Sequence, residues 1–208
     1  MYADTVMYLV GMARETRAER RQRTREELVA SAMRLFAERG VASTSVEAIA
    51  ETAGYSRGAY HSNFETKEEV LDAVVARVVG SLEPELVAVL RDQGSVLERL
   101  AAYVRGFLLY YARRPVETRA LVAVVAHRTT AAADAYDELV AASLADVIAL
   151  LEEGQRNGEM RGFDLVMMAA MLRRTLDAEG LRVAHGAPVD AVSDELVATF
   201  SRATRSAP

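Results

Sequence analysis

The sequence contains no cysteine. This absence excludes disulfide bonds, thiolate metal ligands and thiol nucleophiles, and it fits a reducing cytoplasm, where we expect the protein to work. Long hydrophobic runs are also missing, because arginine, glutamate or aspartate interrupts each apolar stretch. None reaches the roughly eighteen residues that a membrane span needs, so we expect no membrane contact. The opening segment MYADTVMYLVG lacks the positive region of a signal peptide, and Met12 is the more natural start.

Lysine is almost absent, since Lys67 is the only lysine among 25 basic residues. Codon usage in a GC-rich genome accounts for this bias, and the net charge of −5 does not indicate a nucleic-acid binder. The distribution of charge is more informative. One local surplus precedes the first predicted helix, where Glu15 and Glu19 face Arg14, Arg17, Arg20, Arg21, Arg23 and Arg25. This segment fits either a basic arm on DNA or a solvated tail.

Helical patterns fill the rest of the chain, and no stretch alternates long enough to predict a sheet. Four capping-box patterns mark predicted helix starts: Thr24-x-x-Glu27, Thr44-x-x-Glu47, Thr66-x-x-Glu69 and Ser95-x-x-Glu98. We predict helices over about 25–39, 45–53, 57–64, 67 onward, 96–113, 115–128, 132–156, 165–184 and 188–201. Pro84 should kink the fourth helix or begin a new segment. The sequence therefore predicts an all-α fold of about nine helices, with a small N-terminal unit and a larger C-terminal domain.

The N-terminal unit contains a helix-turn-helix pattern, with its turn at 53–55. In such motifs the first residues of the second helix reach base edges in the major groove. Here that helix begins Ser56-Arg57-Gly58-Ala59. Arg57 can pair bidentately with guanine, while Gly58 and Ala59 are small enough for close approach or for contact with a thymine methyl. The alternatives are that Ser56 only caps the helix and that Arg57 is an ordinary solvated residue.

The run TREELVASAMRLFAERGVASTSVEAIAETAGYSRGAYHSNFETKEEVLDAVV closely resembles the N-terminal domain of the TetR family of regulators. The resemblance covers about residues 24–76 without a gap, whereas the remainder resembles the family only in layout. It implies a DNA-binding transcriptional regulator, a repressor that binds a double-stranded operator as a homodimer and is released by a small apolar or amphipathic effector. The implied organisation is an N-terminal extension and arm (1–23), a DNA-binding domain (24–70) and a ligand-binding and dimerisation domain (71–208).

The resemblance also implies roles for single residues. Thr44 would cap the second helix and approach a phosphate, and Ser56, Arg57, Gly58 and Ala59 would face bases or backbone. Tyr60 occupies the family's usually buried position, within the segment 55–61 that we assign to the DNA interface. Lys67 would meet a phosphate. Two departures stand out: Tyr55 replaces a smaller aliphatic residue, and His61 replaces a phosphate-contacting tyrosine, which would make that contact pH-sensitive.

The C-terminal helices carry two candidate sets of apolar residues. The first could line an effector pocket, although such residues are more often simply core: Tyr103, Phe107, Tyr110, Tyr111, His127, Met167, Met168 and Met171. The second lies on the last two helices, which the resemblance assigns to the dimer interface: Leu165, Met168, Leu172, Leu176, Gly180, Val192, Leu196 and Phe200.

Other classes of function have less support. An enzyme needs convergent catalytic groups, but His61, His127 and His185 lie far apart and show neither metal-ligand spacing nor a nucleophile motif. We therefore expect no catalytic site, no metal and no cofactor. An interaction module without DNA binding, or a helix-turn-helix regulator without a small ligand, stays open as an alternative.

Overall fold

A computed structural model describes residues 15–131 and 144–206. Within these residues the fold is all-α, as predicted, and the only extended pairing is one isolated bridge, Met160 to Arg205. The helices are α2 (Arg17–Arg39), α3 (Val46–Thr52), α4 (Arg57–His61), α5 (Lys67–Leu90), α6 (Val96–Arg113), α7 (Pro115–Ala131), α9 (Ala145–Arg156), α10 (Leu165–Ala184) and α11 (Val189–Thr204).

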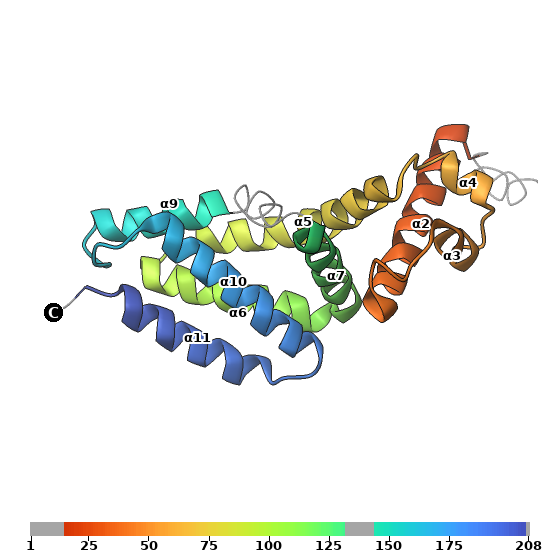
Figure 1. The fold of residues 1–208 in the computed structure, drawn as a ribbon. Helices are drawn as coiled ribbons and strands as arrows, with labels where there is room; N and C mark the ends of the chain where they lie inside the picture. The colour runs from red at the N-terminus through yellow and green to blue at the C-terminus, as the bar shows by residue number, and fades with distance from the viewer. Residues whose placement is uncertain (1–14, 132–143, 207–208) are drawn as a thin grey trace, which may run out of the picture.

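The helices gather at two ends of an elongated molecule (Figure 1). Helices α2, α3 and α4 form a small head, and α6, α9, α10 and α11 lie at the other end, with α5 and α7 between. The head is held by side chains with almost no exposed surface, among them Leu28, Phe36, Ile49 and Tyr60. Burial of such side chains is worth about 1.5–3 kcal/mol each, which lets short helices form one stable unit.

Helix α5 runs from the head into the body without a break. Pro84 lies inside this helix. The prediction of a kink or a new segment at Pro84 is wrong in its second alternative, because one helix spans Lys67–Leu90. A proline ring clashes with the carbonyl of the residue four positions earlier and removes one N–H donor. Here that residue is Gly80, and both residues are exposed, so water can solvate the carbonyl left without its helical partner.

Packing of α6 against α10 fixes the body, and one glycine makes it possible. A methyl group built on Gly180 would lie 2.0 Å from Cδ2 of Tyr111, so only glycine lets α10 approach the Tyr111 ring. Tyr111 is fully buried and its ring centroid lies 4.6 Å from that of Phe107. The same α6 also contacts α5 and α11, so it lies at the centre of the body.

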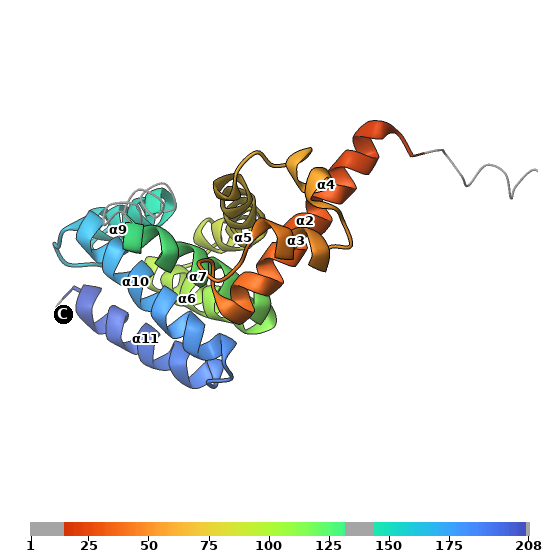
Figure 2. The same ribbon diagram turned by 45° about the vertical axis from the view of Figure 1, so that its right-hand side comes forward.

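The head is joined to the body by more than the chain itself. Helix α2 packs along α7, and Figure 2 shows the two helices side by side from a second direction. Arg128 of α7 adds an ion pair 2.6 Å from Asp72 and 3.8 Å from Glu68, both near the start of α5. A movement of α7 or α5 would therefore be transmitted to the head through these contacts.

Two predicted helix starts were wrong, and both errors concern threonines. Thr24 does not begin the first helix: it lies buried inside α2, which starts eight residues before the predicted residue 25, at Arg17, after a capping box between Thr16 and Glu19. Thr44 does not cap α3 either, since Ser45 does so and accepts from the N–H of Ala48.

The other described boundaries lie within three residues of the prediction: α4 ends at His61 rather than at 64, and α7 and α11 extend to Ala131 and Thr204 rather than to 128 and 201. Helices α6 and α10 have the predicted bounds, and the Ser95–Glu98 capping box is present. Thr66 caps α5, although the Glu69 carboxylate accepts from the N–H of Glu65 rather than from that of Thr66. The first part of the helix predicted over 132–156 lies outside the described residues.

Candidate nucleic-acid interface and internal cavity

The turn between α3 and α4 has the geometry of a helix-turn-helix. Gly54 adopts φ +77°, a left-handed conformation that glycine reaches without strain. The N–H of Gly54 donates to the carbonyl of Glu51 over 2.9 Å, and that of Tyr55 donates to Ala50 over 2.8 Å. Ser56 then caps α4 by accepting from the N–H of Ala59. Each of the two helices starts at a serine cap, and a glycine forms the turn between them. Neighbouring residues therefore specify the motif.

Helix α4 presents one polar edge to solvent and buries the other. Ser56, Arg57 and Gly58 are exposed, and Ala59 is half-buried. Tyr60 has no exposed surface and its hydroxyl donates to the carbonyl of Thr66 over 3.3 Å. Burial raises the pKa of Tyr60 to about 12. Tyr60 therefore anchors the helix from within and presents no side-chain atom to a ligand, which corrects its inclusion among the DNA contacts.

Arg57 is held by a carboxylate in this structure. Its Nε lies 3.2 Å from Oε1 of Glu47 on α3, and both side chains are more than half exposed. An exposed pair of this kind is worth about 0–1 kcal/mol, so it breaks easily. The pair aims Arg57 along the exposed edge of the motif and leaves it available to an incoming acceptor.

The neighbouring residues have defined roles within the head. The Tyr55 hydroxyl donates to the Glu27 carboxylate of α2, so the unusual tyrosine in the turn ties α2 to the motif. His61 is exposed at the end of α4 and meets the Tyr60 ring edge-on, with centroids 5.3 Å apart.

Lys67 and Thr44, which were predicted to contact phosphates, both donate hydrogen bonds to backbone carbonyls within the head. The ammonium of Lys67 donates to the carbonyl of Val41 over 2.6 Å, and partial burial lowers its pKa. Lys67 thus fastens the start of α5 to the loop after α2. Thr44 is only 2% exposed and its hydroxyl donates to the carbonyl of Gly40 over 2.8 Å. Its side chain is engaged inside the head, and Ser45 is the exposed residue beside it.

The basic segment before residue 25 is helical rather than an extended arm over its described part. Arg20, Arg21 and Arg23 are exposed on the first turns of α2. Glu15 lies 3.5 Å from Arg20 and 3.1 Å from Arg23, so two of these charges are partly compensated. Arg25 belongs to the fold, since its guanidinium lies 4.0 Å above the Phe64 ring and donates to the Asn63 carbonyl.

A cavity of about 640 Å³ opens in the body between α5, α6, α7, α9 and α10. Most of its described wall is aliphatic, from Val75, Val79, Leu82, Leu86 and Leu90 on α5, from Leu121, Val122 and Val125 on α7, and from Val147, Ala178 and Leu181. This volume lies within the range of drug-sized ligand sites.

The cavity contains only part of the predicted pocket set. Tyr103 and Tyr111 line it, whereas Phe107 and Tyr110 are buried core residues that do not. His127 and Met168 are half-buried and also lie outside its wall. Met167 and Met171 are 63% and 52% exposed on α10, so they face outward rather than into the cavity. Their helical spacing alone could not tell the two faces of α10 apart.

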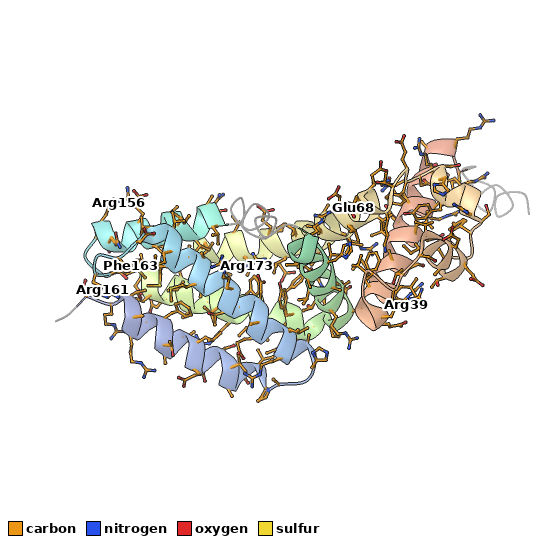
Figure 3. The ribbon with its side chains drawn as sticks, viewed as in Figure 1. Arg39, Glu68, Arg156, Arg161, Phe163 and Arg173 are labelled. Atoms are coloured by element: carbon orange, nitrogen blue, oxygen red, sulfur yellow. The ribbon has the colours of Figure 1, made fainter. Side chains whose placement is uncertain are left out.

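A compact polar cluster, made of Tyr103, Tyr111, Arg173 and Asp177, forms one part of the wall. Arg173 Nε donates to both Asp177 carboxylate oxygens, over 3.1 and 3.0 Å, and the Tyr111 hydroxyl donates to Oδ1 over 3.1 Å. The guanidinium lies 5.0 Å from the centroid of the Phe107 ring. Figure 3 labels Arg173 on α10, within the body.

Burial sets the protonation of this cluster. It raises the pKa of Tyr103 to about 12 and holds the pKa of Tyr111 well above its usual value, so both phenols keep their protons. Desolvation opposes the charge of Arg173, but attraction to Asp177, Tyr111 and Tyr103 together outweighs it, so the pKa of Arg173 is raised. Arg173 and Asp177 were not predicted from the sequence, although their i, i+4 spacing on an apolar helix was the available signal.

The predicted dimer residues also divide into two groups. Leu172, Leu176 and Phe200 are buried within the chain, and Gly180 faces Tyr111 of its own chain, so the side of α10 and α11 that they occupy packs inward. Leu165, Met168, Val192 and Leu196 are half-buried. The most exposed large apolar residues of the described chain are instead Val166, Met167 and Met171, all on α10.

Residues 15–131 and 144–206 contain neither a cluster of metal-ligating side chains nor a helix long and apolar enough to cross a membrane. The three histidines lie on or next to three different helices, α4, α7 and α10.

Comparison with known proteins agrees with the geometry of the head. A family model described as bacterial regulatory proteins, tetR family, matches residues 28–74, which form the second half of α2, all of α3 and α4, and the start of α5. This part of the chain is therefore similar to the TetR family of bacterial regulatory proteins. This confirms the resemblance drawn from the sequence and accounts for the capped, glycine-turned helix pair.

Two TetR-family relatives match beyond the head. The regulator AcrR of Shigella flexneri is 29% identical over 159 residues, which cover 74% of this chain and 66% of AcrR. The regulator BetI of Rhizobium meliloti (strain 1021) is 29% identical over 120 residues, which cover 50% of this chain and 59% of BetI. The matched part thus spans less than two thirds of each relative, and both relatives are named as transcriptional regulators.

Solved structures extend the likeness to most of the fold. The fatty acid degradation regulator FadR from Bacillus halodurans superposes with a TM-score of 0.76 over 86% of this chain and 94% of that one, at 19% identity. Identity this low establishes a shared fold and leaves the ligand of each protein to its own cavity.

Proposed function

We propose that this protein is a transcriptional regulator that binds a double-stranded DNA operator through α4 and acts as a repressor. One observation carries the proposal: the exposed edge Ser56-Arg57-Gly58 stands on a helix-turn-helix whose other face is buried in the head. The N-terminal residues of such a helix reach base edges, and arginine is the commonest reader of guanine. Such a role would place the protein beside the chromosome, in the cytoplasm.

The DNA-binding form is a homodimer in this proposal. Motifs of this kind bind two half-sites about one DNA turn apart, which takes two heads. Val166, Met167 and Met171 support the outer face of α10 as the contact, because three large apolar side chains stand more than half exposed on one helix. The C-terminal part from 71 onward then serves for dimerisation and ligand binding, and 24–70 for DNA.

Release by a small molecule is the second part of the proposal, and the cavity supports it. Its wall includes Asp72 and Arg128, the pair that joins α5 to α7 beside the head. A ligand that fits the cavity better when these helices have shifted would weaken operator binding, because only differential affinity moves an equilibrium. A regulator without a ligand is the alternative, which a cavity of about 640 Å³ disfavours.

The proposal is tested by selecting duplexes from a random pool with the full chain and by gel shift against the DNA upstream of its own gene. We expect a short palindromic consensus and a shift at much lower protein concentration than on random DNA. Arg57→Ala should reduce the preference for the selected duplex about 5- to 150-fold, and Arg105→Ala, far along the body on α6, serves as the matched control. Equal binding to selected and random duplexes by the unaltered chain would contradict the proposal.

A further inference from the structure

The cavity wall combines a long apolar side with one small polar cluster, and this contrast limits what it can hold. The α5 part of the wall runs from Asp72 to Leu90, more than four helical turns, and its inward side chains between these ends are almost all aliphatic. A wall of this kind stabilises a ligand whose body is mostly hydrocarbon.

The charges of the polar cluster compensate each other. Arg173 and Asp177 form a two-oxygen pair with side chains only 11% and 22% exposed, and Tyr111 donates a further hydrogen bond to the same carboxylate. An ion of either sign would have to separate this pair or enter without a counter-charge. Both are costly in a poorly solvated site. The cluster therefore disfavours charged ligands.

The remaining charged residues of the wall are not placed to reverse this preference. Arg128 pairs with Asp72 over 2.6 Å at one end, and Asp146 lies 3.3 Å from Arg91 at the other. Glu83 and Arg174, which also belong to the wall, are largely exposed to solvent, where water screens a charge.

The hydroxyl of Tyr103 is the group that a ligand can use. Tyr103 is 4% exposed and lines the cavity, yet its hydroxyl has no hydrogen-bond partner within residues 15–131 and 144–206. Tyr110 on the same helix shows the usual arrangement, since its hydroxyl is paired with Ser81 and donates to the carbonyl of Val78. The Tyr103 hydroxyl is therefore a donor at the cavity wall that no acceptor among the described residues occupies, and a ligand oxygen in the cavity can accept from it.

We propose that the cavity binds an uncharged, mostly aliphatic molecule whose hydroxyl or carbonyl oxygen accepts a hydrogen bond from Tyr103. The inference rests on the proposed function only in taking this molecule to be the effector. Among the apolar and amphipathic effectors that a pocket of this kind would admit, the uncharged, mostly aliphatic class is the one selected.

The charge preference is tested by calorimetric titration of the full chain, without DNA, with three probes of equal chain length: 1-octanol, octanoate and octylammonium at pH 7. We expect 1-octanol to bind at least about ten-fold more tightly than either ion. Octanoate or octylammonium binding as tightly as 1-octanol would overturn the inference, and so would a failure of all three to bind. Operator selection with the ligand-free chain is unaffected by either result, so it judges the proposed function separately.

Variants locate the hydrogen bond. Tyr103→Phe should weaken 1-octanol binding about three- to ten-fold, because it removes the hydroxyl and keeps the ring. Tyr110→Phe is the matched control on the same helix and should leave the affinity unchanged. Asp177→Asn removes one negative charge from the wall and should raise the affinity for octanoate relative to 1-octanol. Equal effects of Tyr103→Phe and Tyr110→Phe would overturn the assignment of Tyr103.

Discussion

At the scale of single residues, Arg57 is the side chain on which base reading depends, and Glu47 is its competitor. Arg57→Ala should cost about 1–3 kcal/mol on the selected operator and flatten the preference at one base pair. Glu47→Gln frees Arg57 from the 3.2 Å pair and should strengthen operator binding by no more than about five-fold, because the pair is exposed. Fluorescence anisotropy on operator and random duplexes measures both. An equal loss on both duplexes for Arg57→Ala would contradict base reading.

The burial of Tyr103 predicts how the stability of the fold changes at alkaline pH. The pKa of Tyr103 is raised to about 12 by burial, above the value of about 10 in an unfolded chain. The native state therefore holds the proton more tightly, and stability is lost as pH rises from about 10 towards 12. Tyr103 contributes up to about 2–3 kcal/mol to this loss, and Tyr103→Phe should remove that part. Urea unfolding at pH 8 and pH 11 measures it, and a pH dependence unchanged in the variant would contradict the role of Tyr103.

At the scale of elements, substitution by alanine should have opposite effects on stability at two helical glycines. Gly180→Ala should destabilise the chain by about 1–3 kcal/mol, because the methyl group would overlap the Tyr111 ring. Gly80→Ala, inside α5 with open space around it, should stabilise by about 0.5–1 kcal/mol through helix propensity. Thermal unfolding of both variants decides this. A neutral Gly180→Ala would mean that α10 can move away from α6.

Most helices could be predicted because their signals are local. The bounds of α6 and α10 follow from Ser95 with Glu98 and from Asp164, each a cap next to an apolar pattern. The start of α2 was missed because two threonine-glutamate boxes compete within nine residues, and tertiary packing buries Thr24 inside the longer helix. The exposed edge of α4 was likewise readable from the sequence, since a short capped motif needs no distant contact.

The cavity could not be read in the same way, because it is made by helices far apart in sequence. Met167 and Met171 have the spacing of pocket residues, but the side of α10 that faces inward is set by Gly180 against Tyr111. Periodicity shows that a face is apolar and leaves open what covers it. Arg173 and Asp177 were hidden for the same reason, since their pairing becomes meaningful only beside α6.

At the scale of the whole molecule, Arg128 connects the cavity with the head. It lines the cavity and pairs with Asp72 and Glu68 on α5, while its own helix α7 supports α2. Arg128→Gln should reduce the effect of a cavity ligand on operator affinity by about 0.5–2 kcal/mol. Arg105→Gln is the control, because its pair with Asp194 joins α6 to α11 away from the cavity wall. An undiminished ligand effect in Arg128→Gln would exclude this route.

In the mechanism that we propose, one chain couples an operator site in the head to a ligand site in the body. The most direct measurement is the operator affinity of the full chain, by anisotropy, in the absence and presence of saturating 1-octanol. The account predicts a weakening of about 5–150-fold, and by reciprocity the operator must weaken 1-octanol binding by the same factor. Calorimetric binding of 1-octanol with no change in operator affinity would contradict it.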